Sequence, residues 1–150
     1  EHTAKYTKSR KRSSMYDLPT SIQIEDRQYQ ITNNGDYRMI LDCFNALSDG
    51  ELSEDEQVLA SLLIFYNEFA DLEDLPKDEE LLKKLISEMC KFFNCGQEET
   101  VGASVNDKVI DWESDSNIIM PAINNVAHTE VRALEYLHWW TFMGYYMSVG

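Results

Sequence analysis

The chain has 150 residues, of which 43% are hydrophobic, and a formal net charge of -14 at pH 7. This length provides apolar material for one compact core and argues against two full domains. So acidic a protein repels phosphate backbones, which disfavours nucleic-acid binding by the folded part and favours a basic or cationic partner.

The first 14 residues differ from the rest in charge. They carry five Lys or Arg residues against a single acid, Glu1, and almost no apolar side chains. Such a segment cannot bury enough apolar surface to fold, so we expect residues 1–14 to form a disordered basic head. Met15 follows directly, which suggests that the head is an expression leftover or an upstream extension. We expect a single helical domain over residues 15–150.

A β-hairpin is expected after the head, because apolar and polar residues alternate over residues 21–32. We place the loop at Asp26–Arg27, which puts Ile24 opposite Tyr29 and gives the hairpin one apolar face. An isolated hairpin is marginally stable, so this one is expected to lie on helices.

Helix signals follow the hairpin in two places. Residues 33–36, Asn-Asn-Gly-Asp, supply capping side chains, and apolar residues then recur at spacings of three and four as far as Leu47. Ser53 and Glu56 form a capping box ahead of a second apolar run. The sequence therefore predicts one helix that begins after residue 36 and another that begins after Ser53.

Acidic residues dominate the next part of the chain: residues 49–80 contain twelve acids and one base, Lys77. Their order does not match a calcium-binding EF-hand loop, so we expect acids that complement helix dipoles rather than a metal site. Pro76 suits the first position of a third helix. This helix carries an apolar stripe and is expected to end at residues 94–96, Asn-Cys-Gly.

Two further helices are expected towards the C-terminus. We expect Asp115 or Asn117 to cap the fourth helix, and Pro121 must either kink this helix or lie in its first turns. Thr129 is the expected cap of the last helix. The sequence therefore predicts a mainly α fold, a helical domain of about five helices with a short N-terminal β-hairpin over residues 21–32.

The last of these helices is unusually apolar. Between Ala133 and Gly150 there is one formal charge, Glu135, and Trp139 and Trp140 are adjacent. On a helical wheel the apolar surface wraps most of the way round, as in a helix that is central in a bundle or shared with another chain. About 15 uncharged residues are too few for a typical membrane span.

Two interpretations of this apolar surface compete. In the first, the aromatic side chains fill the domain's own core. In the second, some of them are exposed for a partner or an oligomer, because the cores of interfaces favour Trp and Tyr. The second interpretation gives six candidate partner-binding residues: Leu137, Trp139, Trp140, Phe142, Tyr145 and Tyr146.

The sequence offers little for catalysis. It lacks the motifs of serine hydrolases, phosphate-binding loops, zinc proteases and dinucleotide-binding domains. His138, inside the apolar stretch, is expected to be a core histidine rather than a proton carrier. Cys43, Cys90 and Cys95 are odd in number, and no histidine completes a zinc set, so we expect buried thiols. We therefore expect no catalytic residue, no metal, no cofactor and no enzymatic activity.

Several stretches resemble one phage protein family. They are Tyr16-Asp-Leu-Pro-Thr-Ser-Ile-Gln-Ile24, Asp36-Tyr-Arg-Met-Ile-Leu-Asp42, Leu52-Ser-Glu-Asp-Glu-Gln57, Asp111-Trp-Glu-Ser-Asp115 and Glu135-Tyr-Leu-His-Trp-Trp-Thr-Phe142. In this order along residues 15–150, the chain resembles the "Gp-fifteen" proteins of siphophages and of prophages of Gram-positive bacteria. The Leu-His-Trp-Trp-x-Phe segment is the most specific part of the resemblance.

The gene of this family typically lies between those of the major tail protein and the tape-measure protein. The resemblance therefore implies a tail assembly chaperone in the host bacterial cytoplasm, which holds the tape-measure protein soluble while tail-tube subunits polymerise around it. The implied partners are the tape-measure protein and the tail-tube protein, with a homo-oligomer left open and neither nucleic acid nor membrane expected. The alternatives are a structural tail or neck subunit of the virion and an acidic inhibitor that mimics DNA.

Overall fold

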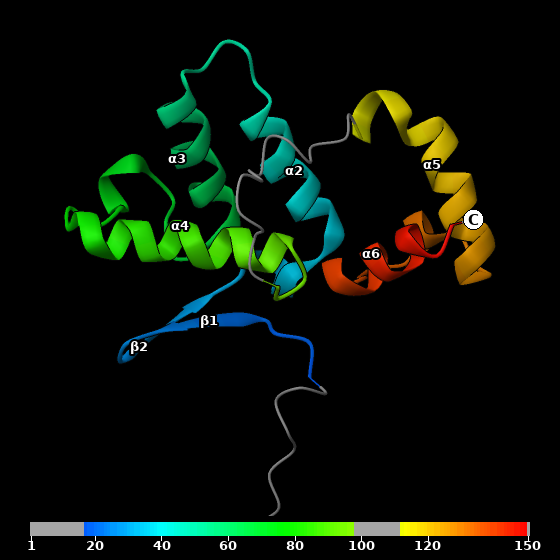
Figure 1. Ribbon diagram of the computed structural model, residues 1–150, viewed down its shortest axis with the longest axis horizontal. Coiled ribbons are helices and arrows are strands. Elements are labelled where there is room, and N and C mark those ends of the chain that lie inside the picture. Colours follow the sequence, from blue (N-terminus) through cyan, green and yellow to red (C-terminus); the bar gives the residue numbers. More distant parts are fainter. Residues whose placement is uncertain (1–16, 98–111, 150) are drawn as a thin grey trace, which may run out of the picture.

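The computed structural model describes residues 17–97 and 112–149 of the chain. These ranges form a two-stranded sheet and five α-helices (Figure 1). The elements are β1 (Ser21–Ile24), β2 (Arg27–Gln30), α2 (Tyr37–Leu47), α3 (Glu54–Phe65), α4 (Glu79–Phe93), α5 (Trp112–Ala127) and α6 (Trp139–Met147), with short 3₁₀ turns η2 (Thr32–Gly35), η3 (Leu72–Asp74) and η5 (Val131–Ala133). The predicted mainly α fold with an N-terminal hairpin is confirmed, whereas the predicted basic head lies outside the described residues.

The hairpin pairs β1 with β2 in an antiparallel register that differs from the predicted one. Its turn is Glu25–Asp26 rather than Asp26–Arg27, so Ile22, not Ile24, lies opposite Tyr29. Moving the turn by one residue shifts every pairing by two positions, and side chains alternate with a period of two. The apolar face is therefore the same in both registers, and Ile22, Ile24 and Tyr29 are all buried.

The hairpin is attached through β2 to the turn that follows α3 and through β1 to α4. The backbone N–H of Asn67 donates to the carbonyl of Gln30 over 2.8 Å, and the N–H of Gln30 donates to both carboxylate oxygens of Glu68 over 2.9 and 3.0 Å. On the other strand, β1 packs against α4, which Figure 1 shows as the long helix that lies between the hairpin and α3. These contacts satisfy the expectation that the hairpin lies on helices.

The first two helices begin as predicted. The carboxylate of Asp36 accepts a hydrogen bond from the N–H of Arg38 at the start of α2. At the start of α3, the Ser53 hydroxyl accepts from the N–H of Glu56 over 3.2 Å, and the Glu56 carboxylate accepts from the N–H of Ser53 over 2.8 Å. This capping box fixes the first turn of α3, which lies beside α2.

The starts of α4 and α5 differ from the predictions. Asp78 caps α4, so Pro76 precedes the helix and does not occupy its first position. Helix α5 begins at Trp112, before both predicted caps, and contains Pro121 in its interior. A proline has no N–H to donate, but the sequence on either side can still be helical when tertiary packing supports it.

The last helix is much shorter than predicted. It starts at Trp139, has nine residues and is capped by His138 instead of Thr129. Between η5 and α6 the chain is not helical: it bends at residues 134–135 and then runs beside the N-terminus of α2, where His138 pairs with Asp36. We call residues 134–138 the extended segment. The helical wheel is therefore wrong for residues 131–138 and applies only to Trp139–Met147.

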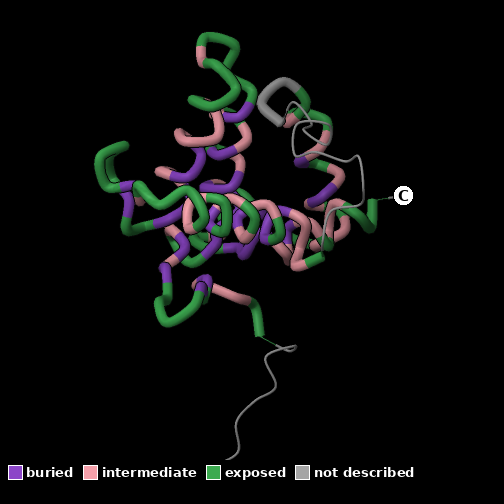
Figure 2. Tube along the Cα trace, turned by 60° about the vertical axis from the view of Figure 1, so that its left-hand side comes forward, coloured by how far each residue is buried: buried purple, intermediate pink, exposed green. Residues whose placement is uncertain are grey.

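The core is one cluster of apolar side chains to which the hairpin and helices α2 to α6 all contribute (Figure 2). At its centre the rings of Tyr37 and Phe142 stack with their centroids 4.4 Å apart and their planes 3° from parallel. The indole of Trp139 stacks on the other side of this pair, 5.6 Å from Phe142. The C-terminal aromatic residues are thus part of the same core as α2.

Candidate partner-binding site

The extended segment 134–138 is held to α2 through the backbone of one residue. The N–H of Leu137 donates to Asp36 Oδ1 over 2.9 Å, and the carbonyl of Leu137 accepts from the N–H of Tyr37, also over 2.9 Å. Both backbone groups of Leu137 are therefore bonded to α2 and its cap. Because these backbone groups are bonded to α2 and Asp36, Leu137 is not part of a helix, although the sequence pattern predicted one here.

An ion pair beside this segment strengthens the junction. Arg38 Nη1 lies 3.1 Å from Asp36 Oδ1, and the Asp36 residue is only 6% exposed. Arg38 Nη2 also donates to the carbonyls of Arg132 and Leu134, and the guanidinium lies over the Tyr37 ring, 4.6 Å from its centroid. One arginine thus connects α2, η5 and the extended segment.

His138 is fully buried and uses both ring nitrogens. Nδ1 accepts from the N–H of Trp140 over 3.0 Å and caps α6, and Nε2 lies 2.7 Å from the carbonyl of Pro19. A carbonyl can only accept, so Nε2 carries the proton and the ring is neutral. Burial lowers the pKa of His138, and the hydrogen bond to Pro19 acts in the opposite direction. The expectation of a hydrogen-bonded core histidine agrees with this geometry.

We predict that stability falls as the pH drops below about 6.5, the ordinary pKa of histidine. The folded-state pKa of His138 is lowered, so the unfolded chain binds more protons in acid. The stability that neutral His138 contributes is therefore complete above about pH 6.5, and it is lost as the pH falls below the lowered pKa of the folded state. Urea unfolding between pH 7.5 and 5.5 measures the effect. His138→Asn keeps a side chain that can cap α6, and His138→Gln keeps a donor for the carbonyl of Pro19. In both variants the free energy of unfolding should depend less steeply on pH. An unchanged slope would show that His138 does not cause the pH dependence.

The two adjacent tryptophans both donate indole hydrogen bonds to the C-terminal end of α4. Trp139 Nε1 donates to the carbonyl of Phe93 over 3.1 Å, and Trp140 Nε1 donates to the carbonyl of Phe92 over 2.9 Å. The last carbonyls of a helix have no partner within the helix. The Trp139 indole supplies a donor for the Phe93 carbonyl, and the Trp140 indole adds a second donor to the Phe92 carbonyl, which also accepts from the N–H of Cys95 over 3.0 Å. The Trp-Trp pair therefore joins α6 to the C-terminus of α4.

The six predicted partner-binding residues do not form one surface. Three of them, Leu137, Trp139 and Phe142, are buried, with exposed fractions of 8%, 1% and 0%. They fill the domain's own core, as the first interpretation of the sequence held, and are not accessible to a partner. The other three, Trp140, Tyr145 and Tyr146, are half-buried.

Trp140 borders a groove between the C-terminus of α4 and α6, which we call the α4–α6 groove. It has a volume of about 540 Å³ and is lined mainly by apolar groups. The lining residues are Phe93, Asn94, Cys95, Gln97, Trp140, Met143, Gly144 and Met147. The surface between α6 and the end of α4 is therefore hollowed as well as apolar.

Two glycines shape the surroundings of the α4–α6 groove. Gly96 has φ of +86°, and a Cβ there would lie 2.9 Å from Trp140 Cη2, so glycine lets the indole lie against the chain after α4. Gly144 has no atom within 4 Å of the position of a Cβ, so it leaves space in the groove. Met147, the last residue of α6, lines the groove and is 75% exposed. The flexible methionine side chain adapts to apolar partners of different shapes.

Sequence reasoning missed most of this groove. Of the residues that line it, only Trp140 is among the six candidates, and Met143, Gly144, Met147 and Cys95 are not. The spacing of Met143 and Met147, four residues apart on a helix, was the one signal available. The part contributed by α4 could not be found this way, because it depends on how α4 and α6 meet.

The remaining chemistry of the described residues is limited. Burial raises the pKa of the thiols of Cys43 and Cys95, which keeps both protonated at neutral pH. In residues 17–97 and 112–149 no group of His, Cys, Asp or Glu is placed to hold a metal ion. No helix in the same ranges is long and apolar enough to cross a membrane.

Comparison with known proteins gives one family. A family model described as "Bacteriophage Gp15 protein" matches residues 15–149, which include the hairpin, every described helix and the α4–α6 groove. Comparisons with curated proteins and with solved structures give no match. The family match begins directly after the predicted basic head, at Met15.

Proposed function

Since the chain belongs to the bacteriophage Gp15 protein family, we propose that it is a non-enzymatic tail assembly chaperone. In this role it binds the tape-measure protein and keeps it soluble while tail-tube subunits polymerise around it. The client docks in the α4–α6 groove, and the chaperone leaves when the tube forms. The proposed place of action is the cytoplasm of the host bacterium.

The observation that carries this proposal is the α4–α6 groove. A long client helix has an apolar stripe that must be covered before assembly, and a groove takes such a stripe by the helix-in-groove mode of recognition. The groove offers an indole face, methionine side chains and the open space at Gly144. These groups can adapt to a stripe whose side chains vary in size.

The charge of the protein supports the same role. The formal net charge of -14 on this chain opposes association between copies of it and contributes negative charge to a complex with the client. The same charge repels nucleic acid, which is abundant where phages assemble. A client with basic residues beside its apolar stripe would be attracted to the protein and steered to it.

The first test fills the α4–α6 groove. In co-expression with fragments of the tape-measure protein from the same phage, Gly144→Leu should reduce the fragment retained in a pull-down by about tenfold. A leucine here takes the place of one client side chain, whose burial is worth about 1.5–3 kcal/mol. The substituted residue meets no atom within 4 Å at its Cβ, and the helix gains from the loss of glycine, so the fold should persist.

Gly50→Leu is the matched control for this substitution. Gly50 also has open space at the Cβ position, and it lies between α2 and α3, away from the groove. It should retain the fragment as the original protein does. Equal retention by the Gly144→Leu and Gly50→Leu variants, with both folded by circular dichroism, would exclude the groove as the client site.

A second measurement separates the chaperone from a structural subunit of the virion. A chaperone leaves before the particle is complete, so mass spectrometry of purified virions should detect no peptide of this chain. Tail-tube and tape-measure peptides in the same sample provide the internal control. Detection of this chain at a level comparable to theirs would favour the structural subunit.

A further inference from the structure

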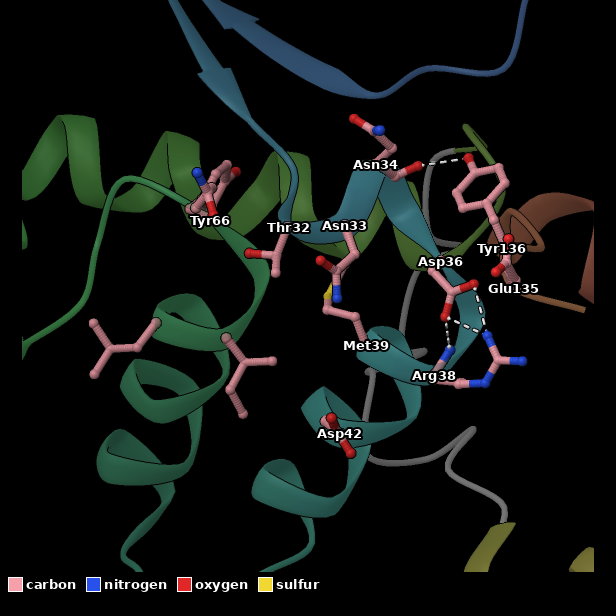
Figure 3. A pocket seen from close by; sticks show the side chains of 13 residues that line it. Thr32, Asn33, Asn34, Asp36, Arg38, Met39, Asp42, Tyr66, Glu135 and Tyr136 are labelled. Atoms are coloured by element: carbon pink, nitrogen blue, oxygen red, sulfur yellow. Dashed lines mark hydrogen bonds and ion pairs between the residues drawn. The ribbon is translucent and has the colours of Figure 1, made fainter. Parts of the chain in front are cut away.

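A second hollow lies where the N-terminus of α2 meets the last turn of α3 and the segment 134–138 (Figure 3). We call it the α2–α3 hollow; its volume is about 710 Å³. One wall is apolar and consists of Met39, Leu63 and Ile64. The rim carries the carboxylates of Asp42, from α2, and Glu135, from the extended segment.

The charged groups of this hollow fall into two kinds. Asp36 and Arg38 are paired with each other and hold the junction of α2 with the extended segment, so they have little capacity for a ligand. Asp42 and Glu135 are exposed, and within residues 17–97 and 112–149 neither forms an ion pair. The hollow therefore presents net negative charge beside an apolar wall.

We propose that the α2–α3 hollow receives one arginine or lysine side chain of the client, with its methylene groups against Met39, Leu63 and Ile64. Its cationic group would lie at the rim near Asp42, and the carboxylate of Glu135, on the other side of the Asp36–Arg38 pair, would add to the attraction (Figure 3). Arginine and lysine cover apolar surface with their stems while the charged end reaches polar groups, which is the combination that this hollow offers. The inference rests on the proposed function, because the side chain belongs to the same client.

The residues that line the hollow disfavour anionic ligands. An anion such as a phosphate would meet two unpaired carboxylates, whose repulsion is unfavourable. Although Asp42 is exposed, the surrounding protein removes part of the water around its carboxyl and raises its pKa, and a cation at this position would lower it again. A cationic side chain is therefore the occupant whose charge complements the hollow.

The two sites are close enough for one helical segment of the client to reach both. Glu135 borders the hollow and Trp140 borders the α4–α6 groove, and five residues of extended chain span at most about 18 Å. A helix covers this distance in about 12 residues, at 1.5 Å per residue. A basic residue near an apolar stripe could then fix the position of the client along the groove.

The direct test is a titration followed by amide chemical shifts, with N-acetyl-arginine amide as the probe. We expect saturable shifts at Asn33, Asp42 and Ile64. N-acetyl-citrulline amide, which has nearly the same shape without the charge, should give shifts at least about fivefold smaller, because the charge supplies the attraction. Equal shifts with the two compounds, or no saturable shift with the arginine compound, would overturn the inference.

Paired variants control for net charge. Asp42→Asn combined with Glu135→Gln should abolish the response to the arginine compound. Asp55→Asn combined with Glu51→Gln removes the same charge at the opposite end of α2 and α3 and should leave the response unchanged. If both pairs weaken the response equally, the probe senses only the overall charge and the inference fails.

The client is tested separately. Asp42→Lys with Glu135→Lys should weaken binding of a retained tape-measure fragment by about three- to tenfold, the range expected for two exposed ion pairs. If the fragment binds this double variant unchanged, the inference fails and the proposed function stands. If the original protein retains no fragment, the proposed function fails and the client side chain with it, whereas the arginine titration still reports whether the hollow prefers a cation.

Discussion

Replacing Trp139 by alanine is expected to lower the free energy of unfolding by about 3–5 kcal/mol, the range typical of large buried aromatic side chains. The indole is 1% exposed and lies between the rings of Phe142 and Phe44, at centroid distances of 5.6 and 5.5 Å. Alanine leaves a cavity between these rings. It also leaves the carbonyl of Phe93, at the end of α4, without the indole donor.

Urea unfolding followed by circular dichroism measures this effect. Trp139→Phe separates its two causes, because phenylalanine keeps most of the stacking and loses the hydrogen bond, and it should cost about 1–3 kcal/mol. Met147→Ala is a control in the same helix: this side chain is 75% exposed, so the change should stay within about 0.5 kcal/mol. A loss below 1 kcal/mol for Trp139→Ala would show that this residue does not support the core.

The second large effect is expected at Asp36, where alanine should cost about 2–4 kcal/mol. The carboxylate caps α2, accepts from the N–H of Leu137 and pairs with Arg38. Its removal takes away a helix cap, worth about 1 kcal/mol, and leaves a buried N–H without a partner, which costs about 1–3 kcal/mol. The extended segment should then detach from α2 more readily.

Asp36→Asn tests whether the cap and the Leu137 hydrogen bond stabilise the protein more than the ion pair with Arg38 does. Asparagine is an equally good cap and keeps an oxygen for the N–H of Leu137, so it should cost only about 1 kcal/mol through the weaker contact with Arg38. Asp42→Ala, on the exposed side of the same helix, should be nearly neutral. Hydrogen exchange at residues 134–138 gives an independent measurement, since faster exchange is expected in Asp36→Ala alone. Equal stability of all three variants would contradict the role assigned to Asp36.

These expected losses affect the choice of variants for binding studies. Alanine at Trp139 would weaken client capture by unfolding the protein, even if the groove were not the client site. Gly144→Leu and the pair of changes at Asp42 and Glu135 avoid this ambiguity, because they lie in open space or on exposed positions. Function and stability can therefore be tested with different residues.

In the hairpin, the sequence pattern predicts which side chains are buried but not the register of the two strands. Alternation assigned Ile22, Ile24 and Tyr29 to one face, and all three are buried. It could not distinguish registers that differ by two residues, because both give the same faces. The turn at Glu25, whose φ is 55°, settles the register. A positive φ at glutamate is uncommon, so no rule of turn composition would have placed the turn there.

The sequence by itself determined the fold class, the caps of α2 and α3 and the position of the apolar stretches, because these depend on neighbouring residues and on short-range periodicity. Only the tertiary structure decided where the last helix begins and what its aromatic residues do. Bonds to α2, more than 90 residues away along the chain, hold Leu137 in an extended segment, and the carbonyls at the end of α4 take both indole N–H groups. Short-range pattern carries no information about such partners. The α4–α6 groove therefore appears only when the two helices are placed together.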